Sequence, residues 1–477
     1  MSLCAVRCIG MNTRRRTLLA AAGSLPVAGI GTGIGSGAVG GSTSTVDFHE
    51  AGDCLDAGEH EFDEAIDWPA DGSDVEICGQ GKEETVLQAG DELPQLVRVR
   101  EDDPDREGQL IIEGLTLDLM DEPTDVEHPI IDIKGDRGDV ILRDVAVRGV
   151  NIPEMEFTSG VILVTGVLDH LQIEDCEFRF DTFAGRPSFE NKYRVVHNVA
   201  NGDESRIDEF EARRNVHYGD LGWDTFDRED NDEDYYNGYK IEVGERAVAT
   251  DCHFDGWDQY CINFRGHEDA TLEAEGLTTV DHGGGDQFMF GARADGVTVE
   301  ASDLTSTGTG DDPESEKIDG DRVLNFQGSQ SPESATVSNC EFQDCRTGIA
   351  VMEGSDLTFS DIEMRNMGLL DGSGNRAVQV LSRHDWTGDI TLENVRVLNG
   401  EDDPRSLEYV VELGSIEGEG YGWEWPFYVE DCRFEGFEGD APINDDATGP
   451  PVPTELSNLH ARNADGEEPD ALLASEV

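Results

Sequence analysis

A short pattern of polar and apolar positions recurs along the chain. It starts with Asp or Asn, continues with Cys or an aliphatic residue, then any residue, and ends with Phe or an aliphatic residue. Clear copies are Asp144–Val147, Asp175–Phe178, Asp251–Phe254, Asn339–Phe342, Asp361–Met364, Asn394–Val397 and Asp431–Phe434, and weaker copies begin at Gly114, Gly276 and Asp303. One unit that repeats with variable loops between copies predicts a solenoid of stacked turns.

The residues in and around each copy have the alternation of short strands. An example is Gly348–Val351, which precedes Leu357–Phe359. Apolar residues at every second position, interrupted by Gly, Asp and Asn, predict half-buried strands joined by turns. No stretch between copies keeps a 3.6-residue apolar period long enough for a crossover helix. The fold class predicted is therefore all-β, a parallel β-helix with two or three short strands per turn.

The cysteines support this stacking. Four of them share the slot two positions before Phe, where alternation points both side chains inward: Cys176, Cys252, Cys340 and Cys432. They are predicted to be buried, reduced thiols that act as small apolar filler. No paired CxxC spacing indicates a metal cluster. Cys54 and Cys78 are candidates for a disulfide in an oxidising compartment, but nothing in the sequence specifies that pairing.

The segment Val75–Leu87 contains Gly79-Gln80-Gly81 followed by Thr85 and an aliphatic residue. It resembles the first coil of right-handed parallel β-helix proteins of the pectate-lyase-like superfamily. The resemblance covers about residues 45–440 and implies a single-stranded, right-handed solenoid. It specifies architecture more than chemistry, because this fold is used by lyases, hydrolases, epimerases and adhesins.

Five segments are predicted. Residues 1–40 form a twin-arginine-type signal peptide, residues 41–74 an N-terminal cap, and residues 75–440 the β-helix, with an excursion at 181–240. Residues 441–477 are predicted to be an acidic, partly disordered tail. The excursion is placed there because Asp175 and Asp251 are 76 positions apart, and long loops on rigid scaffolds often carry recognition.

The N-terminal segment has the order of an export signal. Thr13–Leu19 reads T-R-R-R-T-L-L, which resembles the twin-arginine pattern, and a Gly- and Ala-rich apolar stretch follows to Gly40. Met11 is a candidate for the true start. No later run of eighteen apolar residues exists, so no membrane span is predicted. The expected location is outside the cell or at its surface, after export by the twin-arginine route.

The charge is extreme. The chain has 104 acidic and 34 basic residues, a net charge of −70, and only five of the basic residues are Lys. Molar salt shortens the Debye length to about 3 Å and screens the resulting repulsion. Such an acidic composition resembles that of proteins from extreme halophiles. It argues against nucleic-acid binding, which needs a basic surface, and it does not indicate an oligomeric state.

A polar row is predicted on one outer face. Ile262 and Phe264 should point inward, so Asn263 and Arg265 should point outward. Aligning later strands places these amides over one another, with Gln327 and Arg265 beside them: Asn263, Gln287, Asn325 and Gln379. Amide and guanidinium groups suit the hydroxyls and carboxylates of an extended polysaccharide or cell-surface glycan. A solvated face with stacked amides is an equal alternative.

Candidates for chemistry lie near this face. By the resemblance, lyases of the superfamily use a basic residue to remove a proton α to a uronate carboxylate, often with Ca²⁺ bound to that carboxylate. The catalytic candidates are Arg265, Lys317, Arg322 and His282. The candidate Ca²⁺ ligands are Asp281, Asp286, Asp311 and Asp312.

A hydrolase of the same superfamily is a weaker alternative. Its aspartate pattern is not reproduced, since Gly310-Asp311-Asp312 matches one element and Gly266-His267 precedes it in the wrong order. In so acidic a chain, paired aspartates are more often solvated surface. The leading interpretation is an exported polysaccharide-binding β-helix, with uronate lyase activity ahead of hydrolysis. A non-catalytic surface or adhesion module is the competing class, and the sequence does not decide whether the protein is an enzyme.

Overall fold

The computed structural model describes the chain in segments. They are residues 44–45, 54–62, 65–68, 73–89, 96–98, 106–118, 129–148, 161–180, 192–198, 205–219, 235–257, 260–282, 286–308, 322–327, 332–352, 356–368, 375–382, 388–400, 407–415, 426–446 and 452–475. The chain divides into two units, Met1–Ser42 and Thr43–Val477. The first unit, and with it the predicted signal peptide 1–40, lies outside the described residues.

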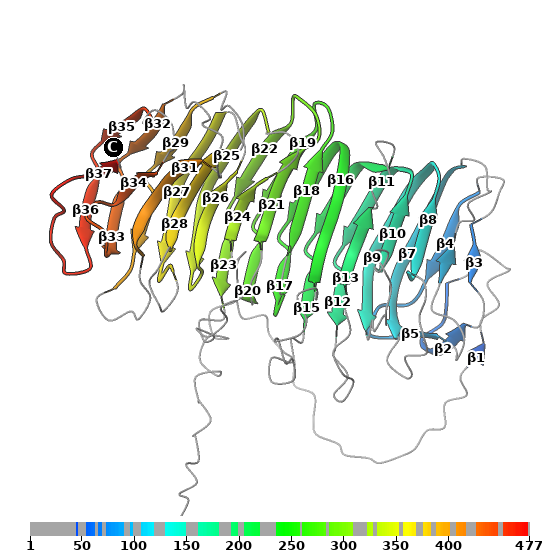
Figure 1. Ribbon diagram of the computed structural model, residues 1–477. Coiled ribbons are helices and arrows are strands. Elements are labelled where there is room, and N and C mark those ends of the chain that lie inside the picture. The colour runs from blue at the N-terminus through cyan, green and yellow to red at the C-terminus, as the bar shows by residue number, and fades with distance from the viewer. Residues whose placement is uncertain are drawn as a thin grey trace, which may run out of the picture. The chain divides into compact units, whose positions relative to one another are not determined.

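The second unit is a parallel β-helix (Figure 1). Every described element is a strand, and the strands pair in parallel with those of the preceding and following turns. Each turn passes through three sheets, which we call sheet 1, sheet 2 and sheet 3 in the order that the chain visits them. The predicted all-β, single-stranded parallel β-helix is confirmed, with three strands per turn.

Sheet 1 has the first strand of each turn. Its members are β3 (Ile66–Asp67), β6 (Val97–Arg98), β8 (Ile131–Lys134), β10 (Ile162–Thr165), β13 (Lys192–Asn198), the first part of β16 (Tyr235–Thr250), β18 (Ile262–Gly266), β21 (Asp286–Ala292), β24 (Arg322–Phe326), β26 (Thr347–Val351), β28 (Arg376–Ser382), β31 (Tyr409–Ser415), β34 (Ile443–Asp446) and β37 (Leu473–Ser475).

Sheet 2 follows. Its members are β4 (Val75–Cys78), the first parts of β7 (Arg106–Asp118) and β9 (Arg137–Arg148), β11 (Val167–Glu174), β14 (Arg206–Arg213), the last part of β16, β19 (Thr271–Glu275), β22 (Thr298–Ser302), the first parts of β25 (Ser334–Gln343) and β27 (Asp356–Arg365), β29 (Ile390–Glu393), β32 (Phe427–Glu430) and β35 (Thr454–Ser457).

Sheet 3 completes the turn. Its members are β1 (Ser44–Thr45), β2 (Gly58–Phe62), β5 (Thr85–Ala89), the last parts of β7 and β9, β12 (Glu177–Phe180), β15 (Val216–Gly219), β17 (His253–Asp255), β20 (Thr278–His282), β23 (Thr305–Gly308), the last parts of β25 and β27, β30 (Arg396–Leu398), β33 (Arg433–Phe437) and β36 (His460–Asn463).

The first residue of the recurring pattern makes the corner between sheets 2 and 3. In each of these copies it has a left-handed backbone with φ between 51° and 57°: Asp144, Asp175, Asp251, Asp303, Asn339, Asp361, Asn394 and Asp431. Gly114 and Gly276 occupy the same corner with φ of 64° and 66°. Gly, Asn and Asp tolerate this conformation better than other residues, which explains why the pattern begins with them.

The inward slots of the pattern fill the core. All four predicted thiols are buried, and so are the pattern's Phe178, Phe254, Phe342 and Phe434. Cys340 pairs in register with Ile362 of the next turn, as stacked turns require. Burial raises the pKa of Cys176 to about 12. These thiols are therefore protonated filler, as predicted.

The excursion predicted at 181–240 contains a whole turn of the solenoid. β13, β14 and β15 pair in parallel with the turns on both sides. The corner here is Arg214, with φ of 54°, followed by Asn215 in the cysteine slot and His217 in the phenylalanine slot. The prediction of an excursion was wrong for these strands, because this turn keeps the backbone of the pattern with different residues.

The two ends also extend the solenoid beyond the predicted bounds. β2 and β3 pair with β5 and β6, so residues assigned to the cap already form strands of the coil. β35, β36 and β37 form a further turn after residue 440. The prediction of a disordered tail was wrong for the described part of 441–477, where short alternating strands continue between acidic turns.

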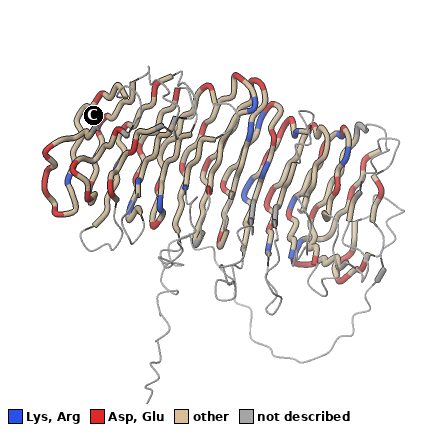
Figure 2. The backbone as a smooth tube through the Cα atoms, viewed as in Figure 1, with Lys and Arg blue, Asp and Glu red and all other residues tan. Residues whose placement is uncertain are grey.

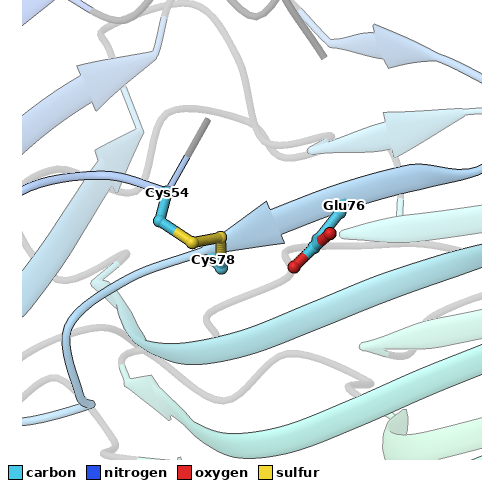
Figure 3. A group of neighbouring side chains, drawn as sticks. All are labelled: Cys54, Glu76 and Cys78. Carbon is cyan, nitrogen blue, oxygen red and sulfur yellow. A yellow bond between two sulfur atoms is a disulfide. The ribbon is translucent and has the colours of Figure 1, made fainter. Parts of the chain in front are cut away.

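A disulfide links Cys54 to Cys78 at the N-terminal end of the described coil (Figure 3). Cys78 ends β4, the first strand of sheet 2. The pairing that the sequence left open is thus made in the structure, and it ties the segment before β2 to the first full turn.

Candidate functional site: the outer surface of sheet 1

The outward positions of sheet 1 form a column along the solenoid. Strand register places its members on successive turns in the order Lys240, Asn263, Met289, Asn325, Ala350, Gln379 and Glu412. Three of the four amides predicted to share a column therefore do so. They stand on every second turn, with Met289 and Ala350 between them.

Gln287 is not in this column, and its predicted place was wrong. Phe288 and Phe290, not their neighbours, pair with the inward Ile262 and Phe264, so Met289 takes the outward position beside Asn263. Gln287 is 0% exposed, and its Oε1 accepts a hydrogen bond from the Cys261 thiol at 3.2 Å. Aligning by polar character alone had shifted this strand by two residues.

Sheet 1 is bordered by the connections that vary most in length. The corner from sheet 2 to sheet 3 is short and repeats from turn to turn, as the left-handed residues show. The connections into sheet 1 include residues 181–191, 220–234 and 309–321, and those out of it include 383–389 and 416–425. Variation in length is thus confined to both borders of sheet 1, where loops on a rigid scaffold can contact a ligand.

Around β18, a buried acid holds two arginines. Glu242 accepts two hydrogen bonds from Arg293, at 2.7 and 2.9 Å, and lies 3.8 Å from the guanidinium of Arg265. Arg265 also donates to Asn263 Oδ1 at 3.2 Å. Its side chain is 25% exposed against 7% for Glu242, so the cation faces outward over the acid. Burial lowers the pKa of Arg265, opposed by Glu242 and aided by Arg293.

Around β24, an acid again contacts an arginine and an amide. Asn325 donates to Asp286 Oδ2 at 2.6 Å, and Arg322 lies 3.7 Å from the other oxygen of that carboxylate. The amide of Asn325 also approaches Gln327 Oε1 at 3.4 Å. Two residues predicted to belong to the site, Arg322 and Asn325, thus both contact the carboxylate of Asp286. The sequence had predicted Asp286 as a metal ligand.

Around β28, a third group has the same composition. Gln379 donates to Glu412 Oε2 at 3.0 Å, and Arg376 contacts the other oxygen of Glu412 at 2.9 Å. Arg376 also lies over the ring of Tyr409, 5.7 Å from its centroid. Each of the three groups therefore combines one amide of the column, at least one arginine and one acid.

Two amide atoms in the column have no hydrogen-bond partner. They are Nδ2 of Asn263, a donor, and Oδ1 of Asn325, an acceptor, in side chains that are 1% and 0% exposed. Buried polar groups are normally paired, by protein atoms or by ordered water. The column thus has a buried donor and a buried acceptor at positions where ordered water normally completes the pairing.

The sequence missed Glu242, Arg293, Arg376 and Glu412. Glu242 and Arg293 lie far apart in the chain and meet only through the stacking of turns. For Arg376 a signal was present, because Arg376-x-x-Gln379 repeats the spacing of Arg322-x-x-Asn325. Aligning the strands on their arginines as well as their amides would have found it.

His282 lies elsewhere. It ends β20 in sheet 3 and is buried, with its Nε2 2.9 Å from Ser306 Oγ and 3.5 Å from the Cys345 thiol. The expectation that it lies near the amide row was wrong, because the bulge at the end of β20 turns it into the core. Lys317, Asp311 and Asp312 lie outside the described residues, as does the side chain of Asp281.

The described part of the site does not form a Ca²⁺ cage. The carboxylate of Asp286 already accepts from Asn325 and faces Arg322, a cation. Among the described residues, the group of potential metal ligands found is Cys54, Glu76 and Cys78 (Figure 3). Both thiols there are consumed by the disulfide, and Ca²⁺ prefers oxygen ligands, so this group fits neither a thiolate site nor a calcium site.

Acidic residues are spread along the described coil, and basic residues are sparser (Figure 2). No helix within the described ranges is long and apolar enough to cross a membrane.

Comparisons with known proteins reveal only distant similarity. No protein-family model matches the chain, and no curated protein matches it. The crystal structure of the pre-mature bacteriophage phi29 gene product 12 is similar to it with a TM-score of 0.33 and 10% identity, over 87% of this chain and 53% of that one. The chain thus spans about half the length of that phage protein. At this TM-score the likeness indicates neither family nor function.

Proposed function

We propose that the protein is exported and binds a polysaccharide along the outer surface of sheet 1. The partly exposed guanidiniums of Arg265 and Arg322, on the strands that carry the amides of the column, are the observation that carries this proposal. Their N–H donors suit the hydroxyls and carboxylates of a sugar polymer. The Cys54–Cys78 disulfide supports export, because disulfides persist mainly in oxidising compartments.

The surrounding guanidiniums favour an acidic or hydroxyl-rich ligand. Arg265 and Arg322 are about a quarter exposed, while the acids that hold them are nearly buried. Each guanidinium has five N–H donors, and one carboxylate uses only some of them. The remaining donors face outward, over the buried amides, so a ligand would meet the arginines first.

Uronate elimination is the candidate activity of this surface. The environment of Arg265 lowers its pKa, which makes loss of its proton less costly than in water. In the proposed step, Arg265 takes the proton at C5, α to the carboxylate. The electrons of that C–H bond form the C4–C5 double bond as the C4–O bond breaks, and water donates a proton to the departing oxygen.

Incubation with a panel of polysaccharides in molar salt tests both the proposed binding and the proposed elimination. Polygalacturonate, alginate, cellulose oligomers and mannan would be assayed for binding by calorimetry and for unsaturated uronate by absorbance. Binding is expected to fall at least tenfold in N325A and to persist in T358A, a control on the outer face of sheet 2. Elimination, where present, is expected to be lost in R265K with binding retained.

The alternative outcomes are distinct. New reducing ends without unsaturated product would replace elimination by hydrolysis. Binding without either product would leave a polysaccharide-binding module. Binding to none of the polymers would contradict the proposal and favour the competing class, a stiff surface or adhesion module.

A further inference from the structure

Polar and apolar turns alternate on the outer surface of sheet 1. β18 presents Asn263 and Arg265, β24 presents Asn325 and Gln327, and β28 presents Gln379. The intervening strands present Met289 and Gly291 on β21, and Ala350 and Met352 on β26. We call β18, β24 and β28 the donor turns, and β21 and β26 the apolar turns.

The donor turns match in detail as well as in type. Arg322 and Asn325 on β24 have the same offset as Arg376 and Gln379 on β28. Between them, β26 has Thr347 in register with Arg322, and Ala350 in register with Asn325. The unit that repeats on this surface is therefore two turns long.

Two turns correspond to a definite length. Adjacent parallel strands lie about 4.8 Å apart, so donor turns recur at about 10 Å, which is close to one disaccharide of a fully extended glycan. A β-1,4-linked chain of this kind rotates by half a turn at each sugar. It therefore presents the same hydroxyl edge in one direction only at every second residue.

We infer that sheet 1 recognises a linear glycan with a two-sugar repeat, laid along the solenoid axis. This inference rests on the proposed polysaccharide binding and adds its period. The donor turns pair the hydroxyl or carboxylate edge of alternate sugars. The apolar turns contact the C–H face of the sugars between them, where Met289 and Ala350 leave no donor to be stranded. An amide there would be unpaired by a sugar that presents only its C–H face.

Linkage geometry tests the period with composition held constant. Cellohexaose and maltohexaose are both glucose hexamers, but the β-1,4 chain is extended with a two-sugar repeat and the α-1,4 chain coils. Hexamers of β-1,4-mannan, β-1,4-mannuronan and α-1,4-galacturonan complete the set. Calorimetry in molar NaCl is expected to give at least tenfold tighter binding for one or more β-1,4 hexamers than for either α-1,4 hexamer.

Length dependence gives a second readout. With the tightest β-1,4 probe taken from dimer to octamer, affinity is expected to rise in steps of two sugars. Q327A, on a donor turn and half-buried, should lower affinity at least tenfold. A350N, which puts an amide on an apolar turn, should weaken binding of the β-1,4 probe. T358A on sheet 2 should change neither, and thermal unfolding would confirm that each variant is folded.

The failures separate the two proposals. Tighter binding of an α-1,4 hexamer, or affinity that rises evenly with each added sugar, would overturn the two-sugar period and leave glycan binding intact. Binding of none of the five hexamers would contradict both.

Discussion

His217 shows how a polar residue is accommodated inside the solenoid. Its ring stacks between Phe178 and Phe254, with centroids 5.1 and 4.4 Å away. Its Nε2 lies 2.8 Å from the hydroxyl of Tyr239, which also accepts from Asn215 Nδ2 at 3.0 Å. The imidazole therefore replaces a phenyl ring in the aromatic stack and pairs its Nε2 with the buried Tyr239, while its Nδ1 has no hydrogen-bond partner.

This residue makes stability depend on pH. Burial lowers the pKa of His217 well below 6.5, so the folded protein keeps it neutral. The unfolded chain binds a proton there below about pH 6.5. The contribution of His217 to the free energy of unfolding is thus complete above about pH 6.5, and it falls by about 1.4 kcal/mol for each pH unit below that. Urea unfolding from pH 7.5 to 5 should show a flatter profile for H217F than for the unmodified protein.

A second variant separates titration from packing. H217Q keeps a hydrogen-bonding group near Tyr239 and does not titrate, so its profile should be as flat as that of H217F. In both variants Tyr239 keeps its hydrogen bond to Asn215. The altered contact between Tyr239 and residue 217 should therefore change the free energy of unfolding equally at every pH and leave the slope of the pH profile unchanged. Equal slopes in all three proteins would mean that His217 titrates alike in the folded and unfolded states.

At the scale of the element, the corner between sheets 2 and 3 forms a ladder of alternating acids and amides. Its later members follow in the order Asp303, Asn339, Asp361, Asn394, Asp431 and Asn458. Asn394 donates to Asp361 at 2.6 Å, Asn458 donates to Asp431 at 2.6 Å, and Asn339 donates to Asp303. Alternation keeps carboxylates from standing on neighbouring turns. Earlier in the coil, Arg214 serves this purpose by pairing with Asp175, whose pKa it lowers.

Breaking the alternation should destabilise the coil. N394D puts carboxylates on three successive turns, with neighbours about 4.8 Å apart. Repulsion of about 1 kcal/mol per neighbour is expected in low salt, and less in molar salt. N394G keeps a residue that accepts the left-handed backbone and adds no charge. The loss of unfolding free energy relative to the unmodified protein should therefore be larger in low salt than in molar salt for N394D, and independent of salt for N394G. An equal salt effect in N394G would refute the repulsion.

The sequence predicted this element well where its residues are typical. Asp, Asn or Gly at the corner, followed by alternating apolar residues, located the strands because those residues are favoured by that backbone. The turn with Arg214, Asn215 and His217 was missed, since each departs from the pattern while the backbone does not. The site was predicted in part. Asn263, Asn325 and Gln379 share the column, but Gln287 does not, because its neighbours Phe288 and Phe290 decide the register.

At the scale of the whole molecule, the disulfide protects the N-terminal end of the coil. Cys54 and Cys78 are 24 positions apart. Closing a loop of about this length removes unfolded-state entropy equivalent to about 3 kcal/mol. Reduction should therefore speed hydrogen exchange of β2 and β4 amides about a hundredfold, because a solenoid can open from its ends. Amides of β31, many turns away, should be unaffected, and uniform acceleration would show that the coil opens as one unit.

The charge of the whole chain predicts a strong dependence of stability on salt. A net charge of −70 opposes compaction, and unfolding lets the carboxylates separate. The Debye length falls from about 10 Å at 0.1 M to about 3 Å at 1 M, shorter than the spacing of neighbouring turns. The Tm should therefore rise steeply with NaCl over this range. Near pH 4, where many carboxylates are protonated, the same titration should give a shallower rise. An equally steep rise at both pH values would mean that salt acts through apolar burial and not through screening.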